Sequence, residues 1–386
     1  MKAVRVTRKG ADRVRSGHLW IFASDVEDRG QAEPGEVVQV LDARGRALGV
    51  AHYSSASQIT LRMLTREVRA VDREFYRRRL LRALEHRQRV VAESEAYRLV
   101  FSEGDQLPGL IVDRYGDYLV MQTLTQGMER VKAELVALLR ELVPAKGILE
   151  RNDAAVREKE QLPLSVSTLA GEVPERVWFE MNGLRFQADL MRGQKTGAYL
   201  DQRENYRAAQ AYARGSALDC FTYTGGFALH LARRAERVEA VDSSELALEV
   251  AEAARKANGL ENTQFRQADV FELLAGYVNA GRRYSIIVLD PPAFARSRAN
   301  LEGAARGYKD INYRALKLLE PGGVLVSCSC SQHVSEAMLL EIIAEAALDA
   351  GRTLRVLERR TQARDHPILL TVPETHYLKC LILEVL

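Results

Sequence analysis

The chain has 386 residues, more than one ordinary hydrophobic core holds, which predicts two or three domains. Its net charge of +3 is uneven, because residues 1–90 carry 19 Lys and Arg against 11 Asp and Glu and leave the remainder mildly acidic. No apolar run could span a bilayer or act as a signal peptide, and four cysteines are too few for a disulfide framework. We therefore expect a cytoplasmic protein without a membrane partner.

Residues 1–67 are rich in short β signals. Residues 36–41 and 47–53 predict a hairpin around a turn at 42–45, and residues 58–64 predict another strand. Residues 9–22 (KGADRVRSGHLWIF) resemble the start of the PUA RNA-binding module. The resemblance implies a PUA-like RNA-binding β-barrel, although the basic charge alone fits a polyanionic partner and a solvated arginine-rich face equally well.

Residues 72–175 indicate a linker helix and a small α+β domain of EEHEE-like order. The helix is expected at 72–93, a strand at 98–101, a hairpin within 109–122, a second helix near 128–142 and a strand at 147–151. A hairpin formed by residues 177–180 and 184–190 around Asn182-Gly183 then opens a third domain, residues 176–386.

From Ser216 onward, short apolar runs alternate with helical segments, which predicts an α/β domain with a parallel, doubly wound sheet. The expected parallel strands are residues 217–220, 238–241, 263–267, 284–289 and 323–328. The last two strands, 353–358 and 376–386, have no helix between them and must be antiparallel. This ending resembles the Rossmann-like methyltransferases that use S-adenosylmethionine, and it disfavours a nicotinamide enzyme.

Ligands of such sheets bind beyond the carboxyl ends of the strands. Asp219 ends the first strand and leads into a loop that closes on Gly225-Gly226, where glycine lets the backbone approach a cofactor. Asp242 ends the second strand, the place of an acid that accepts hydrogen bonds from ribose hydroxyls. Asp269 follows the third strand and is expected to meet the adenine amino group.

Two features of the last parallel strands bear on the methyl acceptor. Asp290-Pro291-Pro292 after the fourth strand resembles the Asn/Asp-Pro-Pro-aromatic motif of methyltransferases that bind a planar amine, as in base N-methylation, although Phe294 comes two residues later; otherwise it is only a strand ending. Cys330 lies beyond the fifth strand, where a thiolate could add to carbon 6 of a pyrimidine and make carbon 5 nucleophilic. Cys328 should still lie within that strand and, like Cys220 and Cys380, is expected to be core; the same ordinary explanation stays open for Cys330.

Residues 193–205 (GQKTGAYLDQREN) are the most specific stretch of the chain. Residues 193–197 are not a P-loop, because Gln194 stands where a P-loop has glycine. With the PUA-like front, the α+β domain and Cys330, the stretch resembles the ribosomal large-subunit RNA cytosine-carbon-5 methyltransferases over nearly the whole chain.

The resemblance implies that Cys330 attacks carbon 6 of cytosine, that Asp290 hydrogen-bonds the ring edge, and that Lys195 faces the base or its phosphate. It also implies a large-subunit rRNA substrate, either free or in a partly assembled particle, and a homodimer. No Cys/His cluster repeats at metal-site spacing, so no metal is expected. The residues expected to contact S-adenosylmethionine are Tyr199, Gln202, Arg203, Asp219, Phe221, Tyr223, Thr224, Gly225, Gly226, Asp242, Ser243, Asp269, Val270 and Asp290.

Three other functions stay open. The nearest is N-methylation of an rRNA or tRNA base, with all cysteines structural. The second is an RNA-binding assembly factor with a relict methyltransferase domain, which the retained Asp219, Asp242 and Asp269 disfavour. The third is a small-molecule methyltransferase, for which the basic front end has no evident use. A base that removes the carbon-5 proton is not apparent, and Tyr199, Tyr223, Phe294 and Tyr308 are possible stacking partners for a flipped-out base.

Overall fold

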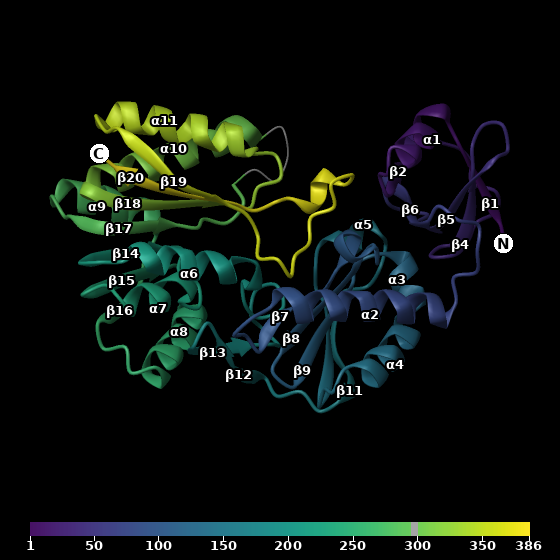
Figure 1. Ribbon diagram of the computed structural model, residues 1–386, viewed down its shortest axis with the longest axis horizontal. Coiled ribbons are helices and arrows are strands. Elements are labelled where there is room, and N and C mark those ends of the chain that lie inside the picture. The colour runs from purple at the N-terminus through teal and green to yellow at the C-terminus, as the bar shows by residue number, and fades with distance from the viewer. Residues whose placement is uncertain (295–299) are drawn as a thin grey trace. The chain divides into compact units, whose positions relative to one another are not determined.

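The computed structural model describes residues 1–294 and 300–386, which divide into two compact units (Figure 1). Unit 1 consists of Met1–Val177, Leu190–Gly197 and Arg364–Thr375; unit 2 consists of Trp178–Asp189, Ala198–Ala363 and His376–Leu386. Both units are therefore discontinuous in sequence. None of the helices in the described part of the chain is long and apolar enough to cross a membrane.

Unit 1 begins with a six-stranded sheet of order β2-β6-β5-β4-β1-β3. Its elements are β1 (Ala3–Val6), α1 (Arg8–Arg15), β2 (Trp20–Phe22), β3 (Val26–Asp28), β4 (Val37–Leu41), β5 (Ala47–Tyr53) and β6 (Ile59–Thr65). Val38 and Val40 alternate into the core, as the period of a half-buried strand requires. The predicted hairpin (β4 and β5) and the strand after it (β6) are confirmed, with antiparallel pairing throughout.

Unit 1 also contains a five-stranded sheet of order β11-β10-β9-β8-β7. Its elements are α2 (Arg73–Val90), β7 (Ala96–Phe101), β8 (Leu110–Tyr115), β9 (Tyr118–Thr123), α3 (Gln126–Arg130), α4 (Lys132–Leu142), β10 (Gly147–Asn152), α5 (Val156–Lys159) and β11 (Ser165–Gly171). The predicted hairpin within 109–122 is confirmed. The single helix expected at 128–142 is wrong, because the chain leaves helical geometry at Val131 (φ −101°, ψ 9°) and forms two helices.

The EEHEE-like order expected for this region is also wrong by one strand, because three strands precede the helices and two follow them. The last strand, β11, lies at the edge of the sheet, and its residues are exposed or only partly buried. A strand without a buried face has no strong alternation of apolar residues, so no strand was located at 165–171 from the sequence.

Helix α2 uses two of its arginines for packing inside unit 1. Arg87 is 2% exposed and donates to the Asp105 carboxylate at 2.5 Å and to the Asp365 carbonyl at 2.7 Å. Arg79 is also buried and donates to the Leu64 carbonyl. These two side chains therefore belong neither to a solvated basic face nor to a surface for polyanions, the two explanations that the charge pattern suggested.

Unit 2 is built on a seven-stranded sheet of order β16-β15-β14-β17-β18-β20-β19. Its strands are β14 (Ser216–Cys220), β15 (Arg237–Asp242), β16 (Thr263–Gln267), β17 (Tyr284–Leu289), β18 (Leu319–Ser329), β19 (Leu354–Arg360) and β20 (Lys379–Val385), and the separate hairpin is β12 (Arg176–Met181) and β13 (Leu184–Asp189). The first five pair in parallel and β20 pairs antiparallel with β18 and β19. The predicted α/β fold, its antiparallel ending and the hairpin at Asn182-Gly183 are confirmed.

Helices cover both faces of this sheet (Figure 1). They are α6 (Arg203–Tyr212), α7 (Gly226–Ala232), α8 (Glu245–Ala257), α9 (Val270–Asn279), α10 (Leu301–Leu318) and α11 (Glu336–Ala350). The last three pack with Leu218, Ile287 and Leu325 of the sheet into one apolar cluster. Because β14, β15, β17 and β18 are parallel, their carboxyl ends meet at one edge, where the predicted loops lie.

Candidate functional site

The loop between β14 and α7 has an unusual backbone. Phe221 (φ 65°), Tyr223 (φ 49°) and Gly225 (φ 83°) all adopt positive φ within five residues. Non-glycine residues rarely do so, and such conformations persist only where the surroundings impose them, which is common at ligand sites. The loop is therefore a preformed turn at the carboxyl edge of the sheet.

Asp219 stabilises this loop through two hydrogen bonds. Its Oδ2 accepts hydrogen bonds from Thr222 Oγ1 at 2.5 Å and from the Ala228 amide at 2.9 Å, while its buried Oδ1 has no partner among the described residues. Burial raises the pKa of Asp219 to about 8, the nearby carboxylates of Asp290 and Asp242 also raise it, and the two hydrogen bonds oppose the shift. Ionising Asp219 therefore costs free energy unless a hydrogen-bond donor reaches its Oδ1.

This pKa predicts how stability depends on pH. The Asp219 carboxyl ionises near its usual 3.8 in the unfolded chain but near 8 in the folded protein, so the folded state binds more protons in between. The free energy of unfolding should therefore fall as pH rises from about 4 to about 8. In Asp219→Asn this contribution is absent, so the variant gains stability relative to the wild type as pH rises. Thermal unfolding without cofactor between about pH 5 and pH 8.5 measures it; parallel curves for the two proteins would contradict the assignment.

The two other predicted acids end neighbouring strands. Asp242 accepts from the Tyr223 amide at 2.8 Å through Oδ2 and from the Ser244 amide at 2.9 Å through Oδ1, so it also fixes the β14–α7 loop. Asp269 is exposed and caps α9, with Oδ1 accepting from the Glu272 amide at 3.0 Å. Both carboxylates lie at the carboxyl ends of their strands, and the structure gives each a part in holding the backbone there.

Gly226 packs directly against an aromatic ring. A Cβ at this position would lie 2.4 Å from Tyr206 Cζ and 2.5 Å from its hydroxyl oxygen. The Tyr206 hydroxyl donates to the Tyr199 carbonyl at 3.2 Å, and the Tyr199 and Tyr223 rings meet edge-on with centroids 5.0 Å apart. Tyr199 and the loop after β14, far apart in sequence, are thus brought together.

The start of α6 provides two further buried polar groups. Gln202 is 1% exposed; its Oε1 accepts from Asn205 at 2.6 Å, and its Nε2 has no oxygen or nitrogen partner in the described part of the chain, the Cys328 thiol being the group it interacts with. Arg203 is 2% exposed, and its Nη2 lies 3.9 Å from Glu204 Oε1. Since buried polar atoms are nearly always paired, an unsatisfied donor on Gln202 and an unsatisfied acceptor on Asp219 fit a polar ligand. The remaining predicted contacts lie on the same loops: Thr224 before α7, Ser243 after β15 and Val270 at the start of α9.

Cys330 is the first residue after β18 and is half-buried, whereas Cys220, Cys328 and Cys380 are fully buried within strands. Cys328 faces Cys380 in the β18–β20 register, which confirms the expectation that these two are core.

Asp290, the first residue after β17, lies in the same electrostatic neighbourhood as Cys330. Burial raises the pKa of Tyr199 and of Tyr308, and the charges of Asp290 and Cys330 raise both further. Leu289 pairs with Ser327 in the parallel β17–β18 register, so Asp290 and Cys330 follow the carboxyl ends of two adjacent strands.

Lys195 belongs to unit 1, whereas the other predicted site residues belong to unit 2. It is exposed and has a positive φ of 54°. The segment around it is tied to unit 1, because Thr196 Oγ1 donates to Asp113 at 2.6 Å and Arg151 donates to the carbonyls of Leu190 and Gly193 at 2.6 and 2.8 Å. These hydrogen bonds fix residues 190–196, which include the start of the stretch 193–205, within unit 1. The sequence did not reveal this structural role.

Sequence reasoning missed one charged residue near Cys330. Lys379 begins β20, is 4% exposed, and donates from Nζ to the Ser331 carbonyl at 2.7 Å and the Tyr377 carbonyl at 2.8 Å. No motif surrounds it. The available signal was a single cation at the start of a strand whose other residues are apolar except Glu384 (KCLILEV), a pattern that more often marks a strand end.

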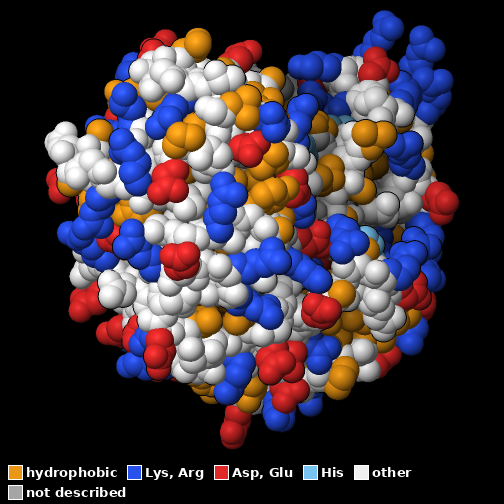
Figure 2. Space-filling view, turned by 60° about the vertical axis from the view of Figure 1, so that its left-hand side comes forward, with side chains coloured by type: hydrophobic (Ala, Val, Ile, Leu, Met, Phe, Trp, Pro, Cys, Tyr) orange, Lys and Arg blue, Asp and Glu red, His pale blue; other side chains and the backbone are white. Residues whose placement is uncertain are grey.

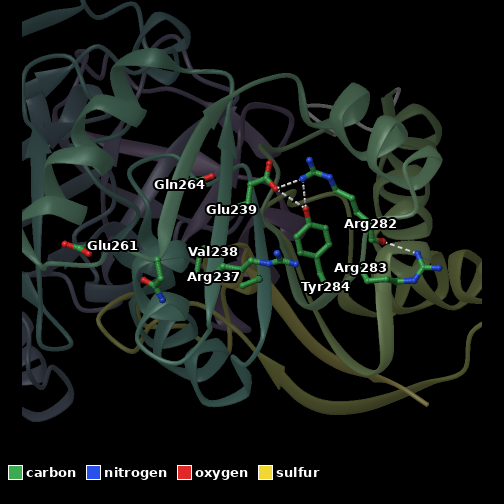
Figure 3. Close-up of a pocket in the computed structure, with 10 residues that line it drawn as sticks. Arg237, Val238, Glu239, Glu261, Gln264, Arg282, Arg283 and Tyr284 are labelled. Carbon is green, nitrogen blue, oxygen red and sulfur yellow. Dashed lines mark hydrogen bonds and ion pairs between the residues drawn. The ribbon is translucent and has the colours of Figure 1, made fainter.

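A cavity of about 550 Å³ lies at the opposite, amino-terminal edge of the sheet (Figure 3). It is lined by Ala217, Arg237, Val238, Glu239, Glu261, Asn262, Gln264, Arg282, Arg283 and Tyr284. Glu239 accepts from Arg282 at 2.9 Å and from the Tyr284 hydroxyl at 3.0 Å, so its charge is neutralised by neighbours (Figure 3). The described lining contains none of the residues predicted for the cofactor.

Family models match two separate parts of the chain. Residues 4–66 match the PUA-like domain and residues 127–383 match the S-adenosylmethionine-dependent methyltransferase family. The second match covers more than half of the chain and agrees with the loop geometry above. The chain therefore belongs to the S-adenosylmethionine-dependent methyltransferases, and S-adenosylmethionine is its cofactor.

Its relatives are more specific. The chain is 45% identical over 377 residues, 95% of each chain, to a protein of Tolumonas auensis named ribosomal RNA large subunit methyltransferase I. It is 42% identical over 389 residues, 98% of each chain, to a Vibrio cholerae protein of the same name. A solved structure of a candidate SAM-dependent methyltransferase from Streptococcus mutans covers 100% of both chains with a TM-score of 0.85 at 21% identity, and a structure complexed with SAH gives 0.87 at 21%; these show the shared fold.

Proposed function

We propose that this protein methylates carbon 5 of a cytosine in large-subunit rRNA and does so through a covalent bond between Cys330 and carbon 6. The observation that carries the proposal is the placement of Cys330: it is half-buried beyond β18 and shares its surroundings with Asp290, while the three other cysteines are buried in strands. The names of the full-length relatives support large-subunit rRNA as the substrate.

The cofactor is assigned to the carboxyl edge of the sheet. The loop after β14, Asp242 and Asp269 would hold its sugar and adenine, and the unsatisfied atoms of Asp219 and Gln202 would gain partners near it. Tyr199, Arg203, Thr224, Ser243 and Val270 complete the proposed contacts. When bound, S-adenosylmethionine supplies an electrophilic methyl group on a sulfonium.

The protein groups then account for the rest of the reaction. The Cys330 thiolate forms a bond to carbon 6, and the electron pair of the carbon 5–carbon 6 double bond moves into the ring, where a hydrogen bond from Asp290 in its protonated form stabilises it. Carbon 5 becomes nucleophilic and accepts the methyl group. Loss of the carbon-5 proton to a base then expels the thiolate with its electron pair and restores the double bond.

Contacts to RNA are assigned to unit 1. A cavity of about 430 Å³ in the PUA-like region is lined by Arg15, Arg46 and Arg66 around Val14 and Leu48. Asp42 bonds Arg15 and Arg46 at 2.8 and 2.9 Å and neutralises part of this charge.

On the face drawn in Figure 2, basic and acidic side chains are interspersed. The cluster of Arg15, Arg46 and Arg66, together with the exposed Lys195, is our candidate for phosphate contacts. The homodimer implied by the family resemblance also remains a proposal.

The test of the function is methyl transfer to large-subunit rRNA. Purified protein, S-adenosylmethionine and rRNA from cells lacking the enzyme are incubated, and the digested nucleosides are identified by mass spectrometry. We expect 5-methylcytidine. An N-methylated nucleoside would instead support base N-methylation, and no product despite measurable cofactor binding would support an assembly factor. Partly assembled large subunits serve as a second substrate, so that failure on naked rRNA has an interpretation.

A further inference from the structure

Lys379 is a buried lysine beside the segment that carries Cys330. It pairs with Ser329 in the β18–β20 register, and its Nζ donates to the Ser331 carbonyl at 2.7 Å. The residues on both sides of Cys330 are thus in contact with Lys379 or its strand. The charge of Cys330 also acts on the ammonium, favouring its protonated form. An ammonium has three N–H donors, and the carbonyls of Ser331 and Tyr377 account for two.

A lysine in this environment needs an anion. Burial lowers the pKa of Lys379 to about 8, while the charges of Cys330 and Glu336 oppose that shift. Glu336 already accepts a hydrogen bond from Arg359 at 2.5 Å, so its charge is largely compensated. Carbonyl groups solvate an ammonium but do not neutralise it. A thiolate on Cys330 is therefore the natural counter-ion.

Helix α10 also contacts the segment that carries Cys330. The Tyr308 hydroxyl contacts Ser329 Oγ at 2.9 Å and Ser331 Oγ at 3.2 Å, and both serines are buried. Tyr308 and Lys379 therefore hold the two residues flanking Cys330.

We propose that Lys379 is a positioning and activating residue: its ammonium holds Cys330 as a thiolate ready to attack carbon 6. Starting from the neutral thiol and the neutral amine, the proton of Cys330 moves to Nζ and the electron pair stays on Sγ, so the net charge of the two groups is unchanged; where Lys379 is already an ammonium, the thiol proton goes to solvent. The same ammonium stabilises the thiolate again when it leaves carbon 6. This inference rests on the proposed function, but its test does not require turnover.

The test titrates Cys330 by the rate of alkylation with iodoacetamide against pH, with the modified peptide quantified by mass spectrometry. Only the thiolate reacts, and the other cysteines are fully buried. In the wild type we expect an apparent pKa below the ordinary value of about 8.5. In Lys379→Met and Lys379→Gln we expect it to rise by roughly one to two pH units, with alkylation near pH 7 slowed about tenfold or more. Lys379→Arg retains the cation and should stay close to the wild type.

The matched control is Lys309→Met, the same change at a partly exposed lysine of α10 that pairs with Glu345 and Asp349. Thermal unfolding and binding of S-adenosylmethionine report whether each variant is folded. A wild-type pKa at or above 8.5, or an unshifted profile in a folded Lys379→Gln protein, overturns the proposal. The wild-type pKa of Cys330 alone can overturn the proposal, so the test stays decisive even if a Lys379 variant does not fold. Full methylation by Cys330→Ala would instead refute the cysteine chemistry while leaving the thiol titration as it is.

Discussion

Cys330→Ala is expected to lower kcat/KM for rRNA methylation by about 1,000-fold or more, because carbon 5 of cytosine is not nucleophilic until a thiolate adds to carbon 6. The substitution removes one sulfur atom from a half-buried position after β18, so the free energy of unfolding and the affinity for S-adenosylmethionine should change little. Initial rates of methyl transfer from labelled cofactor measure the effect.

The matched control is Cys328→Ala, which removes the same atom from the buried strand two residues earlier and should keep most of the activity. RNA containing 5-fluorocytidine gives a second readout, since fluorine at carbon 5 cannot leave as a proton and the adduct accumulates. We expect a protein–RNA species of increased mass with the wild type and Cys328→Ala but not with Cys330→Ala. Unimpaired methylation by Cys330→Ala would leave base N-methylation as the better explanation.

Gly226→Ala should be the most damaging small substitution in the cofactor loop. The added Cβ would lie 2.4 Å from Tyr206 Cζ, and Tyr206 has little room to move because its ring packs against Phe227 and His230 with centroids 4.7 and 5.3 Å away. Overpacking of this kind costs about 1–3 kcal/mol. We expect a loss of stability of this size by chemical denaturation and a weakening of S-adenosylmethionine binding of about tenfold by calorimetry, since the loop must shift.

The comparison variant is Gly276→Ala in α9, where no described atom lies within 4 Å of the added Cβ. Alanine is the better helix former, so this protein should gain about 0.5–1 kcal/mol and bind cofactor normally. Equal effects of the two substitutions would show that the contact with Tyr206 is not what requires glycine at 226.

The α/β unit was the most predictable part of the fold, because strands buried on both faces form continuous apolar runs with clear turns between them. Strand β18 shows the limit: residues 323–328 were expected, but it extends back to Leu319 through Pro321 and two glycines, residues that normally end strands. The domain limits at 1–67, 72–175 and 176–386 remain predictions, since the observed units join non-contiguous segments.

For the site, the positions of Asp219, Asp242, Asp290 and Cys330 follow from one rule, that parallel strands present their carboxyl ends at one edge. Their roles in cofactor and base binding remain predictions. Lys379 could not be found in this way. Its importance depends on the β18–β20 register and on its burial, neither of which a lone lysine in the sequence reveals.

The discontinuity of unit 1 has a consequence for synthesis of the protein. Asp365 accepts a hydrogen bond from the Arg98 amide at 2.8 Å and its carbonyl accepts one from Arg87, so part of the support for α2 and β7 is encoded more than 250 residues downstream of them. Domains generally fold in order as the chain leaves the ribosome. Here the N-terminal unit cannot reach its final hydrogen bonding until nearly the whole chain has been translated, and a nascent chain stalled before Arg364 would leave the Arg98 amide and one Arg87 nitrogen without these acceptors.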